Sequence, residues 1–337
     1  MHDYLNEHQR TAVEALQELK RICTKHEITF YLLAGSTLGA VRHGGMIPWD
    51  DDVDVGFLSE DLDRLKEVLA DELDPRFEYV SYETEPGFPR MFGKILYERQ
   101  SCIDLFFIAR WTTRPVRGYL RWMVNRYTIE SYYRSIGYSK KKALEDTQKA
   151  LDEKTQNEDE NAQSNEALDL KIDGFEVSEE AGNHSDEAMP VELTKEEMRE
   201  KRRRKRRRAR KRRLKKLRRR TLKFVRAVMY YLTPNHKPEH FIKLAKKNER
   251  YFEGPKADCY INLYSVYGMK KEKLKAEWVE NPTTVVFEDD TYTTMGCLDE
   301  YLTHLYRDYM KLPPESQRVC SKHAEIYPRS NAADGRK

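Results

Sequence analysis

The sequence has few of the features that mark membrane-spanning, disulfide-stabilised or zinc-binding proteins. No run approaches the roughly 18 to 20 apolar residues of a membrane span, and the first ten residues, MHDYLNEHQR, lack the apolar stretch of a signal peptide. The five cysteines are scattered and form no C-x-x-C pair. We therefore expect a cytoplasmic protein with reduced, buried thiols. These thiols are Cys23, Cys102, Cys259, Cys297 and Cys320.

Charge is distributed very unevenly along the chain. The 337 residues carry a net charge of only +4, yet 35% of them are charged, and the mean hydropathy is −0.86. Residues 145–200 contain 19 acidic and 5 basic residues, whereas residues 201–226 contain 19 basic residues and no acidic one. Because such compositions cannot bury enough apolar surface to fold, we expect a charged, low-complexity, disordered insert outside a near-neutral folded core.

The basic run from Lys201 to Arg226 suggests three kinds of partner. An anionic membrane surface attracts each nearby Lys or Arg by about 1 kcal/mol, which would hold the protein peripherally at the inner face of the membrane. The run could instead pair with the acidic block, or bind nucleic-acid phosphates without specificity. Residues 201–220 offer no aromatic side chain for stacking on bases. We therefore favour the membrane surface or self-pairing, and specific nucleic-acid binding is not expected.

Apolar periodicity predicts an α/β (α+β) core with a mixed sheet flanked by helices. Spacings of three, four and seven between apolar residues predict an amphipathic helix over 4–25. A short helix is expected at 37–42, and Ser59 is expected to cap another. Short apolar or alternating runs predict the strands. The predicted strands are 28–34, 49–57, 77–82, 92–97 and 103–108.

Composition divides the chain into four segments. Residues 1–138 form the first part of the core, and 139–221 form the charged insert, acidic and then basic. Apolar spacing resumes at 222, so 222–327 is expected to be a helical segment that completes the same domain. Residues 328–337 are expected to be a disordered tail. The insert is thus expected to split one domain and not to separate two.

The cluster WDDDVDVGF at 49–57 carries the first chemical signal. Asp50, Asp52 and Asp54 are spaced two residues apart, so on an extended chain their carboxylates project from one face. Three like charges repel one another, and a divalent cation with oxygen ligands is the usual compensation. A solvated acidic turn is the alternative. An EF-hand loop is excluded because Val55 stands where that loop needs glycine.

Two further signals surround this cluster. Gly35 and Ser36 follow a predicted strand and precede a helix, where free backbone N–H groups and a hydroxyl could hold phosphate. Asp104 lies in the apolar strand CIDLFFI, and an isolated buried carboxylate is costly unless it is paired or bound to a metal. Asp104 is therefore expected to join the cluster, with a strand-end cap or salt bridge as the alternative.

The stretch LLAGSTLGAVRHGGMIPWDDDVDVGF at 32–57 resembles the signature of the LicD family of phosphocholine transferases, which is related to the fukutin-like phosphosugar transferases. The resemblance implies a nucleotidyltransferase (polymerase-β-like) fold, whose pattern is a Gly-Ser turn, an Asp-x-Asp strand and a third aspartate on a later strand. The segment YRDYMKLPPESQRV at 306–319 also resembles the family's closing segment, although Arg307 stands where glycine is usual.

The resemblance implies transfer of phosphocholine from CDP-choline to a hydroxyl of a cell-surface or lipid-linked glycan, such as lipopolysaccharide or teichoic acid, with release of CMP. Asp52, Asp54 and Asp104 would be catalytic and would hold one or two Mg²⁺ (or Mn²⁺) ions, with Asp50 as a further ligand or neighbour. Either Asp54 or Asp104 could accept the proton of the attacking hydroxyl.

Three basic residues are candidates for contacting the donor phosphates, together with Gly35 and Ser36. Arg42 could instead form a surface ion pair, and His43 could be a turn histidine. Lys94 lies on the strand face opposite Ile95.

Two other functions stay open at this stage. The donor could be another CDP-alcohol, carrying ribitol or glycerol phosphate, or the chain could be an inactive binding protein with a nucleotidyltransferase fold. The acceptor, the oligomeric state and the role of the insert do not follow from the sequence.

Overall fold

The computed structural model describes residues 5–138, 221, 224–225, 227–233, 236–252, 257–265, 268–318 and 327. Contacts divide the chain into one unit made of residues 1–152 and 235–337, and a second unit made of residues 153–234. Of the second unit, the described residues between 221 and 232 are helical. The predictions for the acidic block, for most of the basic run, for Cys320 and for the C-terminal tail lie outside the described residues.

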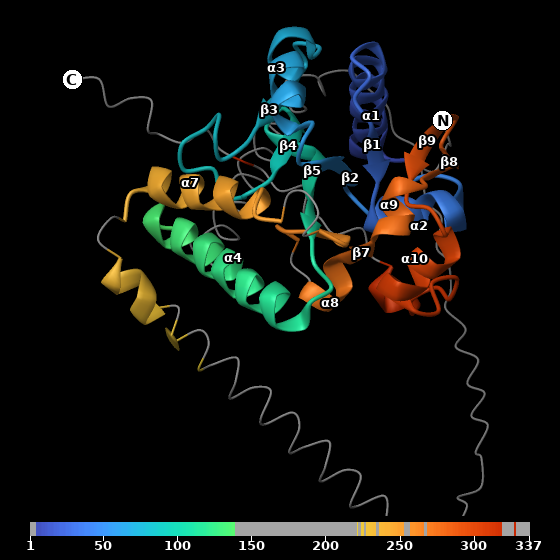
Figure 1. Ribbon diagram of the computed structural model, residues 1–337. Helices are drawn as coiled ribbons and strands as arrows, with labels where there is room; N and C mark the ends of the chain where they lie inside the picture. The colour runs from blue at the N-terminus through green and yellow to red at the C-terminus, as the bar shows by residue number, and fades with distance from the viewer. Residues whose placement is uncertain are drawn as a thin grey trace, which may run out of the picture. The chain divides into compact units, whose positions relative to one another are not determined.

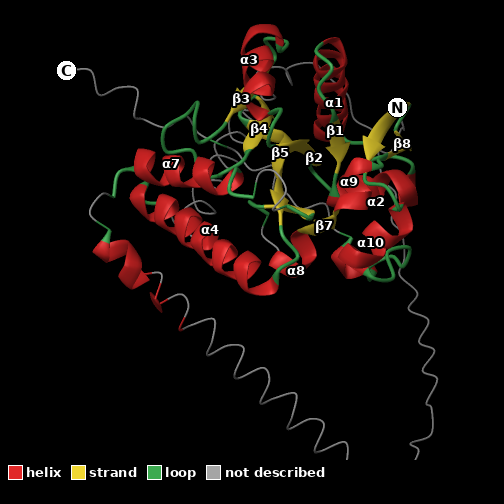
Figure 2. Cartoon of the chain, in the orientation of Figure 1, coloured by secondary structure: helices red, strands yellow, loops and turns green. Residues whose placement is uncertain are grey.

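The first unit combines a mixed sheet with helices (Figures 1 and 2). Its helices of nine or more residues are α1 (Glu7–Lys25), α2 (Ala34–His43), α3 (Leu62–Glu72), α4 (Pro115–Ser135), α7 (Pro238–Glu249) and α10 (Leu298–Tyr306). Shorter helices are α8 (Met269–Glu272), α9 (Ala276–Glu280) and the 3₁₀ turn η2 (Glu315–Gln317). The strands are β1 (Phe30–Leu32), β2 (Val53–Leu58), β3 (Phe77–Val80), β4 (Gly93–Tyr97), β5 (Gln100–Trp111), β6 (Cys259–Asn262), β7 (Lys273–Lys275), β8 (Thr283–Phe287) and β9 (Asp290–Thr294).

Within the described residues, nine strands form one sheet in the order β3-β4-β5-β2-β1-β9-β8, with β6 added to β5 and β7 to β6. The pairs β2–β5 and β1–β9 are parallel, and the others are antiparallel. Strand β5 is the longest, at 12 residues. Its first half pairs with β4 and its last four residues pair with β6. The α/β architecture with a mixed sheet, predicted from the sequence, is confirmed.

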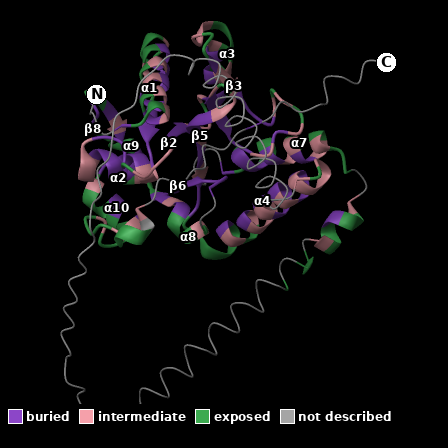
Figure 3. Cartoon of the chain, turned by 180° about the vertical axis from the view of Figure 1, so that it is seen from behind, coloured by how far each residue is buried: buried purple, intermediate pink, exposed green. Residues whose placement is uncertain are grey.

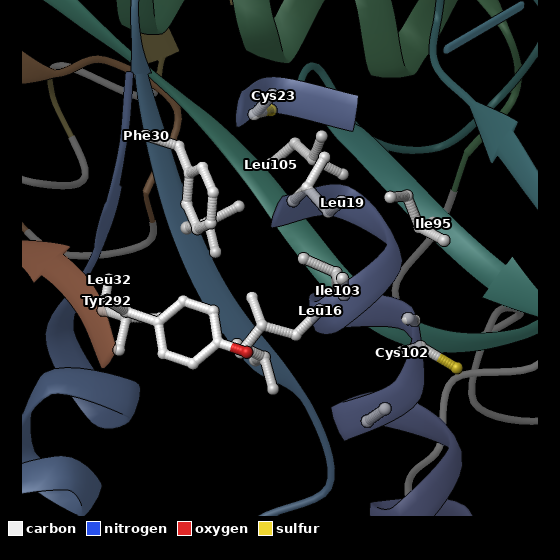
Figure 4. Packing of buried hydrophobic residues seen from close by; sticks show 14 of the residues in the cluster. Leu16, Leu19, Cys23, Phe30, Leu32, Ile95, Cys102, Ile103, Leu105 and Tyr292 are labelled. Carbon is white, nitrogen blue, oxygen red and sulfur yellow. The ribbon is translucent and has the colours of Figure 1, made fainter. Parts of the chain in front are cut away.

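Helix α1 covers one face of this sheet. Figure 4 shows Leu16 and Leu19 of α1 packed toward Ile103 and Leu105 of β5, and all four side chains are fully buried. Val55 of β2 belongs to the same cluster. Because side chains alternate along a strand, the residues between these apolar ones project from the opposite face, where the carboxylates lie.

A capping box begins α1, in which Asn6 accepts from the backbone of Gln9 and the Gln9 side chain accepts from the backbone of Asn6. Elsewhere α4 and α7 lie side by side, joined by a hydrogen bond of 3.2 Å from the Asn248 amide to the Thr128 hydroxyl. Figure 3 shows buried residues concentrated in the sheet and on the inner sides of the helices. None of the described helices is long and apolar enough to cross a membrane.

Four expectations about local structure are corrected. Helix α2 begins at Ala34, so Gly35 and Ser36 lie in its first turn and not in a turn before it. Helix α3 begins at Leu62, and the Ser59 backbone N–H donates to Ile108 instead of Ser59 capping the helix. Cys297 is exposed; it directly precedes α10 and has a positive φ of 48°.

The fourth correction concerns residues 222–327, which were expected to be helical. Besides helices, the described part of this segment contains the four strands β6, β7, β8 and β9. The sequences TTVVF and DTYTT of β8 and β9 are rich in β-branched residues, which favour strands. The β-branched residues were therefore a local signal for β8 and β9. Hydrophobic periodicity did not reveal these strands, because both are short and β8 is largely exposed.

Candidate functional site

Two neighbouring strands bring three aspartates together. Asp54 on β2 and Asp104 on β5 are direct partners in the parallel register, so their side chains leave the same face of the sheet. Asp52 lies just before β2. One carboxylate oxygen from each of Asp52, Asp54 and Asp104 lies within 4.8 Å of the others, and Asp50 forms a second such group with Asp51 and Asp52. We call Asp50, Asp52, Asp54 and Asp104 the carboxylate cluster.

Four negative charges without a counter-ion are electrostatically unfavourable in the carboxylate cluster. Burial, followed by repulsion from neighbouring carboxylates, raises the pKa of Asp50 to about 6. Burial and the charge on Asp104 raise the pKa values of Asp52 and Asp54 well above the usual range for aspartate. A divalent cation would offset this repulsion, and carboxylate oxygens are the ligands that Mg²⁺ and Mn²⁺ prefer. The cluster therefore fits such an ion.

Lys94 of β4 is the cation closest to this cluster among the described residues. It is the antiparallel partner of Asp104, and the residue is only 2% exposed. The ammonium group donates to Oδ1 of Asp104 and, at 2.9 Å, to the Ser101 hydroxyl. Its charge lowers the pKa values of Asp52 and Asp54, opposing the effect of burial. Lys94 is thus a partial counter-ion of the cluster.

The first turn of α2 closes over the carboxylates from the other side. The backbone N–H of Gly35 donates to the Asp54 carboxylate. A Cβ atom on Gly35 would lie 3.1 Å from Oδ2 of Asp50, so a larger residue would require that carboxylate to shift. Ser36 is buried, and its hydroxyl oxygen accepts from the Asp54 backbone N–H at 2.8 Å.

Tyr301 of α10 holds the start of α2. The backbone N–H of Ala34 donates to the Tyr301 hydroxyl at 3.0 Å, and Tyr301 is buried. Ala34 has a φ of 42°, a left-handed conformation that costs a non-glycine residue on the order of 1 kcal/mol. Strain of this kind persists only where the surrounding contacts fix the backbone. Helix α10 thus helps to fix the position of Gly35 and Ser36.

A cleft of about 430 Å³ opens beside the cluster. From the carboxylate side it is lined by Gly35, Asp50 and Asp54, and from α2 by Arg42. The remaining lining residues are Ala34, Leu38, Ile47, Trp49, Tyr306, Asp308, Tyr309, Lys311 and Pro313. Carboxylates therefore lie in the same wall as aromatic and cationic side chains, which is a suitable lining for a phosphorylated ligand with a ring.

The basic candidates from the sequence occupy different places. Arg42 lines the cleft, and its Nη1 donates to the Tyr309 carbonyl at 3.1 Å. His43 is not among the lining residues, and its ring stacks edge-on against Trp49 with centroids 5.6 Å apart. Burial, followed by the Arg42 charge, lowers the pKa of His43. Lys94 approaches the carboxylates from within the sheet. The structure thus brings Gly35, Arg42, Asp50 and Asp54 to one cleft, and His43 is not among the residues that line it.

A second cavity, of about 580 Å³, lies between α3 and α7. Three of its cations pair with carboxylates: Lys66 and Lys246 both contact Glu83, at 2.6 and 2.7 Å, and Arg250 contacts Asp63 at 2.8 Å. Although this cavity is the larger of the two, none of the aspartates in the carboxylate cluster lines it. The smaller cleft is therefore the better candidate for chemistry.

Several site residues were missed by reasoning from the sequence. Tyr306, Tyr309 and Lys311 belong to the closing segment noted for its resemblance, so that resemblance was the signal that could have identified them. Ser101 is a partner of Lys94, and no sequence pattern marked it. Trp49 packs against a buried hydrophobic cluster and also lines the cleft.

Comparison with known proteins agrees with this geometry. Residues 27–132 match the sequence model of the LicD/FKTN/FKRP nucleotidyltransferase domain. An uncharacterized protein of Rickettsia prowazekii is 32% identical over 97 residues, covering 29% of this chain and 33% of that protein. The lipopolysaccharide cholinephosphotransferase LicD of Haemophilus influenzae is 35% identical over 68 residues, or 20% of this chain and 26% of that protein.

A mouse protein, the ribitol 5-phosphate transferase FKRP, is 27% identical over 106 residues, or 31% of this chain and 21% of that protein. The aligned segments span about a third of the length of the first two relatives, 33% and 37%. Residues 27–132 contain the whole carboxylate cluster together with Gly35, Ser36 and Lys94. These residues are therefore similar in sequence to the nucleotidyltransferase domain of the LicD/FKTN/FKRP family.

Proposed function

We propose that this chain is a metal-dependent transferase that moves phosphocholine from CDP-choline to a hydroxyl of a cell-surface or lipid-linked glycan and releases CMP. The observation that carries the proposal is the convergence of Asp52, Asp54 and Asp104 within 4.8 Å beside a cleft lined by Arg42 and Lys311. Phosphoryl transfer depends on positioning and charge neutralisation more than on covalent chemistry. The cluster and the cleft offer both.

In the proposed reaction, the acceptor hydroxyl oxygen forms a bond to the choline-bearing phosphorus. The bond from that phosphorus to the bridging oxygen breaks, and CMP leaves with the bond electrons. Asp52, Asp54 and Asp104 would hold Mg²⁺ or Mn²⁺, which supplies charge neutralisation at the diphosphate when bound. Arg42 and Lys311 would bind the phosphates in the cleft, and Lys94 would add positive charge behind the carboxylates.

The proton of the acceptor hydroxyl must pass to a base. Lys94 and Ser101 both donate to Oδ1 of Asp104, so this oxygen is a poor proton acceptor. Asp54 lines the cleft in which the acceptor would bind, whereas Asp104 is not among the lining residues. Asp54 is therefore the better of the two candidates for this role.

A different alcohol is the second candidate. The mouse relative is a ribitol 5-phosphate transferase and the Haemophilus relative is a cholinephosphotransferase, so ribitol phosphate or glycerol phosphate could take the place of phosphocholine with the same chemistry. The cationic side chains Arg42 and Lys311 would serve the diphosphate of any of these CDP-alcohols equally well.

The test is CMP release from CDP-choline in the presence of Mg²⁺ and a glycan extract. Asp52→Asn removes one charge from the cluster and should lower the rate by about 100-fold, as expected for loss of one electrostatic contact to a transition state. Asp71→Asn, the same change at an exposed position of α3, is the matched control and should keep the wild-type rate. CDP-ribitol and CDP-glycerol are assayed in parallel.

Release from CDP-choline that requires Mg²⁺, extract and Asp52 would support the proposal. Release from CDP-ribitol or CDP-glycerol alone would keep the chemistry and change the donor. A folded protein that releases CMP from no donor would contradict enzyme function and would favour a binding protein.

A further inference from the structure

Resting on this proposed function, we infer that Gln9 of α1 is a positioning residue that fixes the loop carrying Asp50 in the geometry needed to bind a divalent cation. The loop consists of residues 47–51, between α2 and β2. Gln9 lies outside residues 27–132, which match the family domain. Helix α1 would thus be part of the catalytic apparatus and not only a cover for the sheet.

One amide group contacts three carbonyl oxygens of this loop. The Nε2 group of Gln9 donates to the Asp50 carbonyl at 2.8 Å and lies 3.3 Å from the Ile47 carbonyl and 3.4 Å from that of Pro48. Gln9 is only 1% exposed, so water cannot readily replace it. The adjacent residue, His8, places its Nε2 2.9 Å from the Asp51 carbonyl. Two side chains at the start of α1 therefore contact the backbone carbonyl groups of the loop.

The capping box fixes which way the Gln9 amide faces. Its Oε1 accepts from the Asn6 backbone N–H at 3.1 Å, while the Asn6 side chain accepts from the Gln9 backbone N–H at 2.9 Å. Since the oxygen is used by the cap, the NH₂ group must point toward the loop. The position thus requires an acceptor and a donor on one side chain. Glutamate would supply only the acceptor.

The loop needs such a restraint because its carboxylates repel one another when they lie close together. Asp50 stands close to Asp54, within the wall of the same cleft, and Asp50, Asp51 and Asp52 bring carboxylate oxygens within 4.8 Å of one another. Residues 50–52 precede β2 and lack the ladder hydrogen bonds of a strand. Without the amide, repulsion would drive the loop outward. Holding the carbonyls on one side leaves the carboxylates free to face an ion on the other.

The experiment measures Mn²⁺ binding by electron paramagnetic resonance in the full chain, and needs no substrate. Residues 145–200 are rich in carboxylates and will bind Mn²⁺ weakly, so the site is defined as the binding that Asp52→Asn abolishes. Gln9→Glu keeps the capping acceptor and removes the donor, and Gln9→Met removes both while keeping an unbranched side chain. Gln17→Glu, the same change at an exposed position of α1, is the matched control.

We expect the dissociation constant of the Asp52-dependent site to rise at least tenfold in both Gln9 variants and to stay unchanged in Gln17→Glu. Thermal unfolding in EDTA shows whether each variant is folded. Folded Gln9 variants that bind Mn²⁺ as the wild type does would overturn the inference, as would unfolding of both, which would make Gln9 a residue of general stability. If the wild type has no Asp52-dependent site, the proposed metal-dependent function itself fails, and that result is distinct.

Discussion

Replacing Arg307 with glycine should stabilise the protein. Arg307 follows α10 with φ 65° and ψ −109°, a combination outside the small left-handed region that non-glycine residues tolerate. Its backbone is held in place because its N–H donates to Thr303 at 2.8 Å and its carbonyl accepts from Tyr309 at 3.0 Å. Strain of this kind costs about 1 to 3 kcal/mol. Glycine removes it, at a cost of about 0.4 to 1 kcal/mol from the more flexible unfolded chain.

The expected net gain is therefore about 0.5 to 2 kcal/mol, or roughly 1 to 8 °C in Tm, since each kcal/mol shifts Tm by about 2 to 4 °C for a domain of 150 to 250 residues. Urea unfolding and a thermal scan both measure it. Arg307→Ala is the control, because it removes the exposed side chain but keeps the Cβ atom that causes the strain. If Arg307→Gly is no more stable than Arg307→Ala, the reasoning from backbone conformation is wrong.

Two further predictions concern buried charges. Lys94→Met leaves Asp104 as an uncompensated buried charge and should lower the free energy of unfolding in EDTA by about 3 to 5 kcal/mol; Mg²⁺ should restore part of this loss, and an equal loss with and without Mg²⁺ would argue against a cation site. Burial raises the pKa of Glu272 to about 7, against the donated hydrogen bond from Ser265, so the folded state binds this proton more tightly than the unfolded state. Stability should consequently fall as pH rises from about 4.5 to 7, and Glu272→Gln should remove about 3 kcal/mol of that fall; parallel pH profiles of the two proteins in urea would contradict it.

The sequence was a good guide wherever local pattern and tertiary structure agree. The alternation of Val53 and Val55 with Asp54 places apolar and acidic side chains on opposite faces of β2, and the apolar strand around Asp104 lies beside it in register. Both features follow from the two-residue period of a strand. The same period predicts that Lys94 and Ile95 lie on opposite faces of β4. In the structure, Ile95 packs in the core and Lys94 contacts Asp104.

Long-range pairings could not be predicted in the same way. Whether Lys94 reaches Asp104 depends on the register of β4 against β5, and a shift of one residue would turn Lys94 to the other face. The contact of Gln9 with Asp50 joins residues 41 positions apart, and α1 shows only an apolar periodicity in its sequence. The start of α2 at Ala34 depends on Tyr301, 267 positions away. Tertiary contacts of this kind leave no local signal.

The pairing of β1 with β9 has a consequence for synthesis of the protein on the ribosome. The Thr294 hydroxyl donates to the Leu32 carbonyl across 262 positions of sequence, and α10, which supports the start of α2, comes later still. At about 5 to 20 residues per second, translation takes roughly 13 to 50 s to cover that distance. During this interval, the nascent chain carries an unpaired β1 edge, which is a hazard for aggregation. The cleft beside the aspartates can form only after the lining residues between 306 and 313 have been made.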